Sequence, residues 1–530
     1  MKQVLTSFVA LLVLAVGSVS FNTAYAHGGT QPEHGGIVQL VGDMSFELVP
    51  AADHVELWVE DDGEEVTSAD LAAKLTIVDG SAKSEVALTP AGGNKFEAKG
   101  VKIGKGAKVT ALLTLKDKQS KIAANFNSAA SGRRATAEFG SMDGSMMLAA
   151  MGAWTDEMRA IRRDIHRHPE LGFKEQRTAA LVAERLRSWG IPVHEGIGKT
   201  GVVGVISAGS SDRAIGLRAD MDALPIHEST GTPHASVHQG IAHSCGHDGH
   251  TTMLLWAARY LAATRRFNGR VHVIFQPAEE GQAGAKAMMD DGLFDKFPCA
   301  EIYALHNWPS LPMGTVAVRP GPMMAAAARF DIIVRGAGGH AAQPHMATDT
   351  ILCAAQIVTG ANTLVARRID PNAAAVLSVT CIHGGDAHNV LPSEVKITGT
   401  IRTFDPVVQD KIEASLSEVV EGTSRAAGCT ATVEYVRYYP ATINNAECAQ
   451  HVIDASRALF GQALVPDAPA ATSEDFAFML QKVPGAYVWL GQGSDTHRYS
   501  LHHPRYDFND DVLPRGAALL AALAERRLAL

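Results

Sequence analysis

Hydrophobic and polar positions follow two different patterns along the chain, and the change falls near residue 150. Val55, Leu57 and Val59 alternate with polar residues, and similar short runs recur as far as Leu115 with turn residues between them. A period of two predicts half-buried strands, and short strands at this spacing are typical of a small sandwich. We therefore expect a small all-β sandwich module over residues 27–127. Residues 128–152, rich in Ser, Gly, Ala and Met, predict a linker.

Beyond residue 153, apolar residues with helical spacing alternate with short apolar runs that predict strands. The helices are expected over Asp156–His166, Gln176–Trp189 and Thr251–Ala263, and the strands over Gly201–Ser207, Ala214–Leu217, Val271–Phe275, Ile302–Leu305 and Ala486–Leu490. Strands that alternate with helices predict an α/β domain with a mostly parallel sheet covered on its faces. This domain is expected over residues 153–325 and again over 437–530.

Between these two parts, residues 326–436 predict an inserted α+β domain. The expected elements are strand Arg329–Val334, helix Thr348–Ala361, strands Ala375–Ile382 and Glu394–Thr403, helix Val407–Ala427 and strand Ala431–Val436. The order β-α-β-β-α-β is that of a ferredoxin-like sandwich.

The N-terminus has the pattern of an export signal over residues 1–26. Lys2 is followed by an apolar run from about Val4 to Val16, and Ala24-Tyr25-Ala26 has the small-x-small pattern of a signal-peptidase site. The alternative is a membrane anchor, but the run is short for a span of ~20 residues. We expect an exported protein, periplasmic or secreted, whose mature chain begins near His27 and has no stable membrane insertion. A free amine there, with His27 and His34, could bind copper or nickel; the alternative is a polar tail.

Composition and charge exclude some classes of partner. The chain has 530 residues, 46% of them hydrophobic, with a formal net charge of −9 and no long basic run. Nucleic acid is therefore not an expected partner. The six cysteines form no C-x-x-C pair, and an exported protein with a disulfide framework would have a denser pattern. We expect mostly free, buried thiols.

The densest group of potential metal ligands is His243-Ser-Cys-Gly-His-Asp-Gly-His250. Cys245 and His247 are two residues apart, and in an extended segment their side chains would point the same way. A thiolate and an imidazole that face one point suit a transition metal.

Further candidate ligands follow predicted strands. Glu279-Glu280 comes after Val271–Phe275, His306 after Ile302–Leu305, and His502-His503 after the last predicted strand. In an open α/β sheet, sites form beyond the carboxyl ends of the strands. The pattern predicts a metal-dependent hydrolase.

Adjacent Glu279 and Glu280 point in different directions, so they can do different work. One can bind metal while the other takes a proton from a water that the metal has acidified and later passes it to a leaving amine. The alternative is a solvated acidic pair at a helix start, where carboxylates are favoured anyway.

Residues from about 154 to 530 resemble the zinc-type exopeptidase family of carboxypeptidase G, the aminoacylases and hippurate hydrolase. The nearest subgroup is that of hippurate hydrolase and the plant auxin–amino acid conjugate hydrolases. The matching segments, in family order, are Asp164–Leu171, Leu217–Pro225, His243–His250, Gln276–Gly281, Ala304–Trp308, Gly338–Ala342, His388–Pro392, Gly399–Arg402, Thr472–Asp475 and Leu501–Asp507.

The resemblance implies a role for each matching position in a site with two divalent metal ions. The implied metal ligands are Cys245, which bridges the ions, and His247, Glu280, His306 and His502. His503 fills a variable position and is the weaker candidate. Glu279 is implied as the general base, and Asp222 as a residue that orients a ligand from behind. The ligand set suits zinc, manganese, cobalt or nickel.

The inserted domain resembles the family's lid and dimerisation domain, which implies a homodimer. His340 matches a histidine that reaches the active site, often that of the partner subunit, and stabilises the oxyanion. Asn389 and Arg402 match positions that hold the substrate, and the planar guanidinium of Arg402 suits a carboxylate. The alternatives are a histidine in a Gly-rich turn and a surface charge on a strand.

The reaction implied is hydrolysis of an N-acyl amino acid, hippurate-like or a related conjugate, to a carboxylic acid and a free amino acid. One rival is a dipeptidase or carboxypeptidase of the same family. Another is a periplasmic metal-binding protein with an inactive hydrolase half, although no ligand position or base has been lost.

Overall fold

The computed structural model divides the chain into two compact units, residues 1–142 and 143–530. It describes residues 34–127, with short gaps at 35, 42–43, 52, 62–63, 80–81, 104–106 and 115–120, and residues 144–530 without a gap. The predicted signal peptide and His27 lie outside the described residues. No helix among the described residues is long and apolar enough to cross a bilayer.

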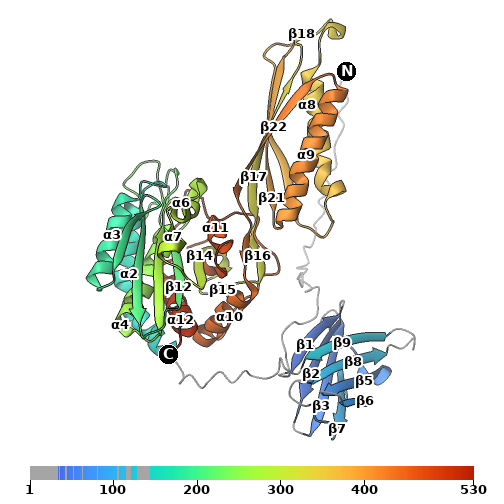
Figure 1. Ribbon diagram of the computed structural model, residues 1–530, viewed down its shortest axis with the longest axis vertical. Coiled ribbons are helices and arrows are strands. Elements are labelled where there is room, and N and C mark those ends of the chain that lie inside the picture. Colours follow the sequence, from blue (N-terminus) through green and yellow to red (C-terminus); the bar gives the residue numbers. More distant parts are fainter. Residues whose placement is uncertain are drawn as a thin grey trace, which may run out of the picture. The chain divides into compact units, whose positions relative to one another are not determined.

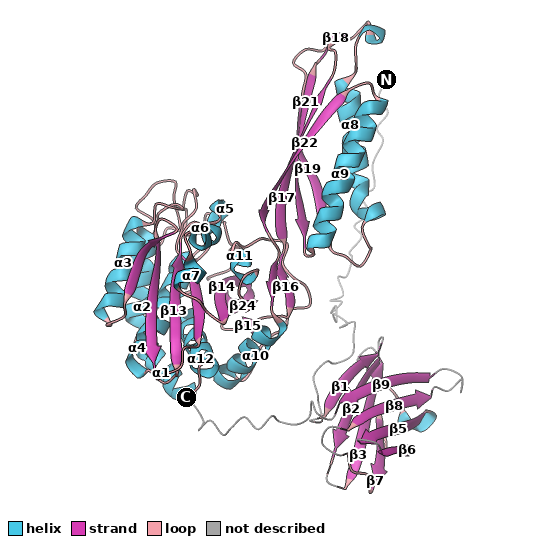
Figure 2. Ribbon diagram, in the orientation of Figure 1, coloured by secondary structure: helices cyan, strands magenta, loops and turns pink. Residues whose placement is uncertain are grey.

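The first unit is an antiparallel β-structure around one core (Figures 1 and 2). Its described strands are β1 (Ile37–Val41), β2 (Met44–Pro50), β3 (His54–Asp61), β4 (Glu64–Glu65), β5 (Ala72–Asp79), β6 (Ala82–Pro90), β7 (Lys95–Lys99), β8 (Lys108–Thr114) and β9 (Lys121–Asn127), with a short 3₁₀ turn at Ser68–Asp70. Val55, Leu57 and Val59 are fully buried in β3, as their alternation predicts. The strands form one continuous hydrogen-bonded sheet, because β6 pairs with β5 and, through Thr89 and Pro90, also with β7.

His34 is held at the surface of this unit. Its main-chain N–H donates to the Glu47 carboxylate, and its ring stacks on Trp58 with centroids 3.5 Å apart. His34 therefore has ordered partners here, whereas its expected companion His27 is not described.

The second unit contains a seven-stranded sheet in the order β10-β11-β13-β12-β14-β24-β15. The strands are β10 (Val193–Ile197), β11 (Gly201–Ala208), β12 (Ala214–Asp220), β13 (Gly269–Gln276), β14 (Glu301–Pro312), β15 (Val316–Ala317) and β24 (Gly485–Gly493). Only the four central strands, β13-β12-β14-β24, are mutually parallel; β10, β11 and β15 pair antiparallel. The prediction of a mostly parallel sheet was thus right for the centre and wrong for the edges, where the short connection from β10 to β11 makes a hairpin.

Helices cover both faces of this sheet. One core packs the sheet against α1 to α4, α10 and α12, and the other packs it against α6, α7 and α11. The helices are α1 (Gly144–Ala153), α2 (Thr155–Arg167), α3 (Gln176–Ser188), α4 (His247–Thr264), α5 (Glu279–Gln282), α6 (Gly284–Asp290), α7 (Leu293–Lys296), α10 (Ala446–Phe460), α11 (Phe476–Leu480) and α12 (Leu513–Arg527), and 3₁₀ turns occur at Pro344–Met346 and Asp510–Val512. Neighbouring residues of one strand, such as Val202 and Val203, belong to opposite cores, because successive side chains point to opposite faces.

Helix α1 corrects the predicted linker. Residues 144–152 were expected to be part of it, but Met147 and Met151, one helical turn apart, are buried in the core beside α12 and α10. The small residues that predicted a linker also allow a helix to pack closely, and the i, i+4 spacing of the two methionines was the missed signal. The remaining linker residues, 128–143, lie outside the described part.

The inserted domain, called the lid here, follows the connecting strand β16 (Gly321–Met324) and ends at β23 (Thr442–Asn444), and these two strands pair with each other. Its sheet has the antiparallel order β19-β21-β17-β22, from β17 (Ala326–Arg335), β19 (Ala375–His383), β21 (Glu394–Thr403) and β22 (Thr430–Tyr439). Helices α8 (Thr350–Arg368) and α9 (Pro406–Ala426) pack on one face of it. The side chains of Asp349 and Asp405 accept from main-chain N–H groups and so begin the two helices. A short pair, β18 (Gly339–His340) with β20 (Val390–Leu391), lies at the end of the lid away from the seven-stranded sheet (Figure 1).

Candidate metal centre

Cys245 and His247 approach each other through a turn at Gly246. Gly246 has φ of +95°, and α4 begins at His247. The extended segment that we expected between the two ligands is therefore absent. The left-handed backbone favours glycine, and a Cβ atom at Gly246 would meet Asn307 Oδ1 at 2.3 Å and Tyr506 Oη at 2.5 Å. The glycine is thus required both for the turn and for the close approach of Asn307 and Tyr506.

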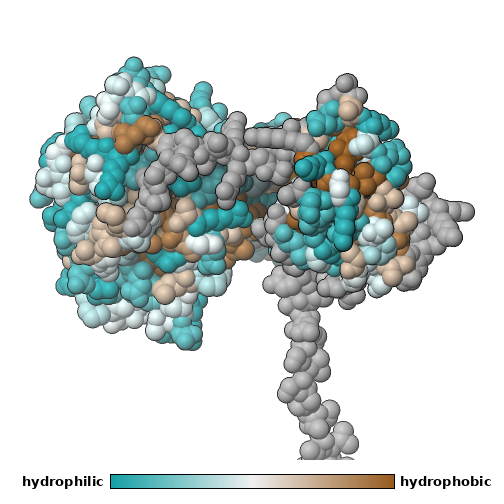
Figure 3. Space-filling view, turned by 90° about the horizontal axis from the view of Figure 1, so that it is seen from below, coloured by the Kyte–Doolittle hydropathy of each residue, from teal (hydrophilic) through white to brown (hydrophobic). Residues whose placement is uncertain are grey.

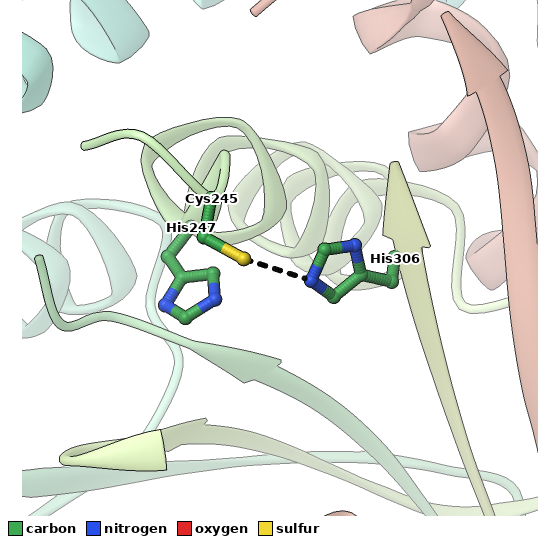
Figure 4. Close-up of side chains that lie close together, drawn as sticks. All are labelled: Cys245, His247 and His306. Atoms are coloured by element: carbon green, nitrogen blue, oxygen red, sulfur yellow. Dashed lines mark hydrogen bonds between the residues drawn. The ribbon is translucent and has the colours of Figure 1, made fainter. Parts of the chain in front are cut away.

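His306 faces this turn from the parallel strand β14. Its Nε2 atom lies 3.4 Å from Sγ of Cys245, and its Nδ1 atom lies 2.7 Å from the main-chain oxygen of Asn307 (Figure 4). The contact with the main-chain carbonyl places a proton on Nδ1 and leaves Nε2 free to bind a metal. Cys245, His247 and His306 form a buried group whose potential ligand atoms lie within 4.8 Å of one another.

Glu280 and His502 complete a second group with Cys245 in the same place. Oε1 of Glu280 lies 3.2 Å from Nε2 of His502, and potential ligand atoms of Cys245, Glu280 and His502 lie within 4.8 Å of one another. The main chain of His502 has φ of +63°, and its N–H donates to the carbonyl of Ser244 at 2.7 Å. Because Cys245 belongs to both groups, its thiol can lie between two ions.

His503 points elsewhere. Its ring stacks on Tyr499 with centroids 4.7 Å apart, and its Nδ1 accepts from the N–H of Arg505. Of the two adjacent histidines, the structure brings His502 to the cluster.

Glu279 lies beside the cluster in a more buried position than Glu280. Glu279 is 6% exposed and forms a third group of potential ligand atoms with His247 and Glu280. Burial, followed by the nearby carboxylates of Glu474, Glu280 and others, raises the pKa of the Glu279 carboxyl well above its usual value. A cation in the site would act in the opposite direction and favour the carboxylate.

Asp222 holds three parts of the site together. Its two carboxylate oxygens each accept one main-chain N–H, from Glu279 and from Glu280, both at 3.0 Å. Its Oδ1 also lies 3.3 Å from Nδ1 of His247. Asp222 therefore fixes the loop that carries the two glutamates, and it also orients the imidazole of His247.

The charges around the cluster suit a cation. Burial disfavours a charge on His247, but Asp220, Asp222 and Glu280 outweigh it and raise the His247 pKa to about 10. Burial, with the Glu280 and Glu279 carboxylates, raises the pKa of the Cys245 thiol well above its usual value. Nε2 of His247 makes no hydrogen bond to any described residue, and the nearest carboxylate oxygens, of Asp220 and Glu280, lie 3.8 and 3.9 Å from it. Buried polar atoms without partners are costly, so these residues fit a divalent metal.

Another group with the same residue types does not fit a cation. Glu301, Cys448 and His451 also lie close together, at the start of β14. Arg213 and Arg527 already neutralise Glu301, with Nη2 atoms at 2.6 and 2.7 Å from Oε1. Two guanidinium groups would repel a metal ion, so this group is an ion-pair cluster.

Asp220 was not predicted as a site residue, and His250, at the end of the ligand-rich segment His243–His250, was not among the predicted ligands. Nδ1 of His250 lies 2.6 Å from Oδ1 of Asp220, and the other ring nitrogen accepts the main-chain N–H of Asn307. Asp220, His247 and His250 form a further buried group of potential ligand atoms. The signal was present in the sequence. Asp220 lies only three residues beyond Leu217, where the predicted strand ends, and it shares a motif with Asp222.

A buried arginine beside the cluster was also not predicted. Arg218 is 1% exposed and donates to Asp220 at 2.7 Å, Glu474 at 2.9 Å and Asp475 at 3.1 Å. Asp475 in turn donates its main-chain N–H to Oε1 of Glu279 at 3.3 Å. This network joins the segment Thr472–Asp475 to the cluster, and no periodic pattern in the sequence predicts it.

The residues expected to hold substrate lie in the lid and not at the cluster of their own chain. His340, in β18, is exposed and accepts the N–H of Ala342 at its Nδ1. The main-chain oxygen of Asn389 accepts the N–H of Ala341, so these two predicted residues are neighbours. Arg402 lies near the other end of the lid, half-buried on β21, where its Nη1 donates to Thr400 and to the Ile401 carbonyl.

Residues 216–526 match the sequence model of the peptidase family M20/M25/M40. This range contains all the residues of the metal cluster. The chain belongs to this family. As a member it is a metal-dependent hydrolase of amide bonds, and the all-β unit lies outside the match.

Individual relatives agree with the family assignment. The chain is 40% identical to a hippurate hydrolase of Campylobacter jejuni, over 70% of this chain and 97% of that protein. It is 38% identical to an N-acetyl-L-cysteine deacetylase of Bacillus subtilis, over 70% and 88%. A solved structure from Bacillus subtilis, described as a dinuclear metal-binding peptidase of the M20 family, matches with a TM-score of 0.64 and 32% identity, over 71% of this chain and 99% of that one. The two groups that share Cys245 accordingly suit two ions.

Proposed function

We propose that the protein hydrolyses the amide bond of N-acyl amino acids and releases a carboxylic acid and a free amino acid. The observation that carries the proposal is the meeting of Cys245, His247, Glu280, His306 and His502 from four separate segments, with Glu279 beside them. The relatives named hippurate hydrolase and N-acetyl-L-cysteine deacetylase support this class of substrate.

The roles of the residues follow from their positions. The cluster would hold two divalent ions, and such ions supply Lewis acidity and lower the pKa of a bound water to ~7. Glu279 accepts a proton from the attacking water and passes it to the amine that leaves, so one water is consumed for each amide bond broken. Asp222 keeps Glu279 and Glu280 in their different orientations, because it binds both of their main-chain N–H groups.

The substrate test is a panel of N-acetyl-, N-benzoyl- and indole-acetyl-amino acids beside unblocked dipeptides, with added Mn²⁺, Co²⁺, Zn²⁺ or Ni²⁺. Faster release of the amino acid from acylated substrates than from dipeptides is the expected result. The second candidate, a dipeptidase or carboxypeptidase, is favoured by the peptidase relative and predicts the reverse order. No hydrolysis of any substrate with every metal would refute both.

We also propose that the enzyme is a homodimer in which the lid of one subunit serves the site of the other. His340 and Asn389 lie together at the far end of the lid, and β19 is an edge strand with Val376 45% and Ile382 52% exposed. An exposed apolar edge strand is a template for pairing with a second chain. Here Arg402 would bind the substrate carboxylate, and His340 would donate to the oxyanion.

Mixing two inactive variants tests this arrangement. A His340→Ala chain keeps Glu279, and a Glu279→Gln chain keeps His340, so a mixed dimer would hold one complete site. Recovered activity after mixing, with a dimer mass from light scattering, is expected. A monomeric protein, or no recovery from a mixture shown to contain mixed dimers, would contradict the proposal.

Finally, we propose that the protein is exported and cleaved after Ala26. The support is the residue pattern of the first 26 positions. N-terminal sequencing of the protein from a periplasmic or secreted fraction should give His27 as the first residue, and recovery of the uncleaved chain from the cytoplasm would refute export.

A further inference from the structure

The main chain at Glu279 is held from two sides by different parts of the second unit. From the loop directly after β12, Asp222 accepts the N–H of Glu279 at 3.0 Å. From the lid, the hydroxyl of Tyr439 donates to the carbonyl oxygen of Glu279 at 2.5 Å and accepts the N–H of Ala283 at 3.2 Å. The phenol thus spans the short segment 279–283 that carries both glutamates.

This segment needs external support to keep its shape. Ala278 and Ala283 have φ of +53° and +56°, and Gly281 has φ of +77°. The left-handed region is unfavourable for residues with a Cβ atom. Such conformations persist only where the surroundings fix them, and the hydrogen bonds of Asp222 and Tyr439 are contacts that do so.

Tyr439 is the last residue of β22, directly before the chain returns from the lid through β23. It is 7% exposed and pairs in register with Ala327 at the start of the lid. A cavity of about 780 Å³ opens beside it, lined among others by Ala283 and Phe478. The lid and the sheet domain are therefore not packed solidly here, and the Tyr439 hydroxyl makes a direct polar link across the junction.

We propose that Tyr439 is a positioning residue that links the lid to the main chain of the general base, so that the position of the lid determines the position of the Glu279 carboxyl. The proposal rests on the proposed function for the role of Glu279. Tyr439 touches neither the metal cluster nor the side chain of Glu279 among the described contacts; it acts on the loop. A rotation of β22 against the sheet would move its hydroxyl, and the carbonyl of Glu279 would move with it or lose the bond.

The test compares Tyr439→Phe with Tyr438→Phe. The two residues are neighbours in the chain, and each variant removes one phenolic hydroxyl. Tyr438 is 41% exposed and lines the same cavity. For Tyr439→Phe we expect kcat to fall at least ~10-fold, equivalent to ~1.4 kcal/mol in the barrier, while KM, metal content and Tm stay close to the wild-type values. Hydrogen exchange at the amide of Ala283 should become faster. Tyr438→Phe should change none of these.

Other outcomes overturn the proposal. If kcat of Tyr439→Phe stays within twofold of wild type, the link does not position the base. If kcat falls only together with Tm and metal content, the hydroxyl merely stabilises the fold. If the wild-type enzyme hydrolyses none of the substrates, the proposed function fails, and the exchange measurement alone decides: an unchanged rate at Ala283 contradicts the link and a faster rate supports it.

Discussion

Sγ of Cys245 lies 3.4 Å from Nε2 of His306, although the two residues are 61 positions apart in the chain. The first follows a loop after β12 and the second lies in the buried part of β14, and these two strands are parallel neighbours. Their carboxyl ends therefore open at the same edge of the sheet, which brings a thiol and an imidazole together.

Replacing this thiol should weaken metal binding. Cys245→Ser substitutes a poor ligand at the position shared by the two groups, and we expect metal affinity to fall by at least the ~10–100-fold typical of residues that only support a ligand. Metal per chain after dialysis, measured by mass spectrometry, checks this. Cys381→Ser, at an exposed thiol of the lid, is the control. A Cys245→Ser protein with its full metal content would exclude Cys245 as a ligand.

Substitution of the two adjacent glutamates should impair the enzyme for different reasons. Glu279→Gln is expected to lower kcat by ~10²–10⁴-fold, the usual contribution of a general acid–base, while the metal content stays unchanged. Glu280→Gln, next to His502, should lose metal first. Measuring kcat and bound metal for both variants separates the two roles. If Glu279→Gln lost metal and Glu280→Gln lost only kcat, then Glu280 would be the general base and Glu279 the metal ligand.

Asp222→Asn tests the support behind the cluster. The new amide nitrogen cannot accept an N–H as the carboxylate does for both Glu279 and Glu280. We expect metal affinity ~10–100-fold lower, measured by competition with a chelator. Asp212→Asn, at an exposed carboxylate paired with Arg270, should bind metal like wild type. Equal affinities for the two variants would show that Asp222 orients nothing.

Glu525 makes stability depend on pH. Burial raises the pKa of this α12 carboxyl from 4.5 to about 7, so the folded state binds the proton more tightly than the unfolded state. This contribution is fully present below pH 4.5 and is lost as the pH rises through about 7. Glu525→Gln should therefore raise Tm at pH 8 by roughly 2–4 °C and change it little at pH 4.5. An equal shift at both pH values would assign the effect to packing instead.

The burial of α1 predicts that the hydrolase unit begins before residue 153. Met151 is fully buried and Met146 is 55% exposed on the same helix. Met151→Ala should lower the free energy of unfolding by about 2–5 kcal/mol, whereas Met146→Ala should change it by no more than ~0.5 kcal/mol. Denaturant unfolding of the two variants measures the difference. Equal stabilities would mean that residues 144–153 are a linker after all.

The local patterns predicted most elements of the second unit because each depends on neighbouring residues. The predicted helix Gln176–Trp189 differs from α3 by a single residue. The predicted strand Ala214–Leu217 was too short, since the charged residues Arg218 and Asp220 at the end of β12 interrupt the apolar run. They are buried because they pair with each other, and a pair of that kind is visible only once the strand is packed.

The amino-acid sequence by itself determined the alternation of elements, the family motifs and the kinds of ligand, because periodicity and motif chemistry are local properties of the chain. Only the tertiary structure decided that Gly246 turns Cys245 towards His306, that Asp222 binds the main chain of both Glu279 and Glu280, and that Tyr439 reaches the carbonyl of Glu279. These relations join residues far apart in the chain. Which residues meet depends on strand order, on left-handed turns and on the packing of one domain against another, and those are set by the whole fold.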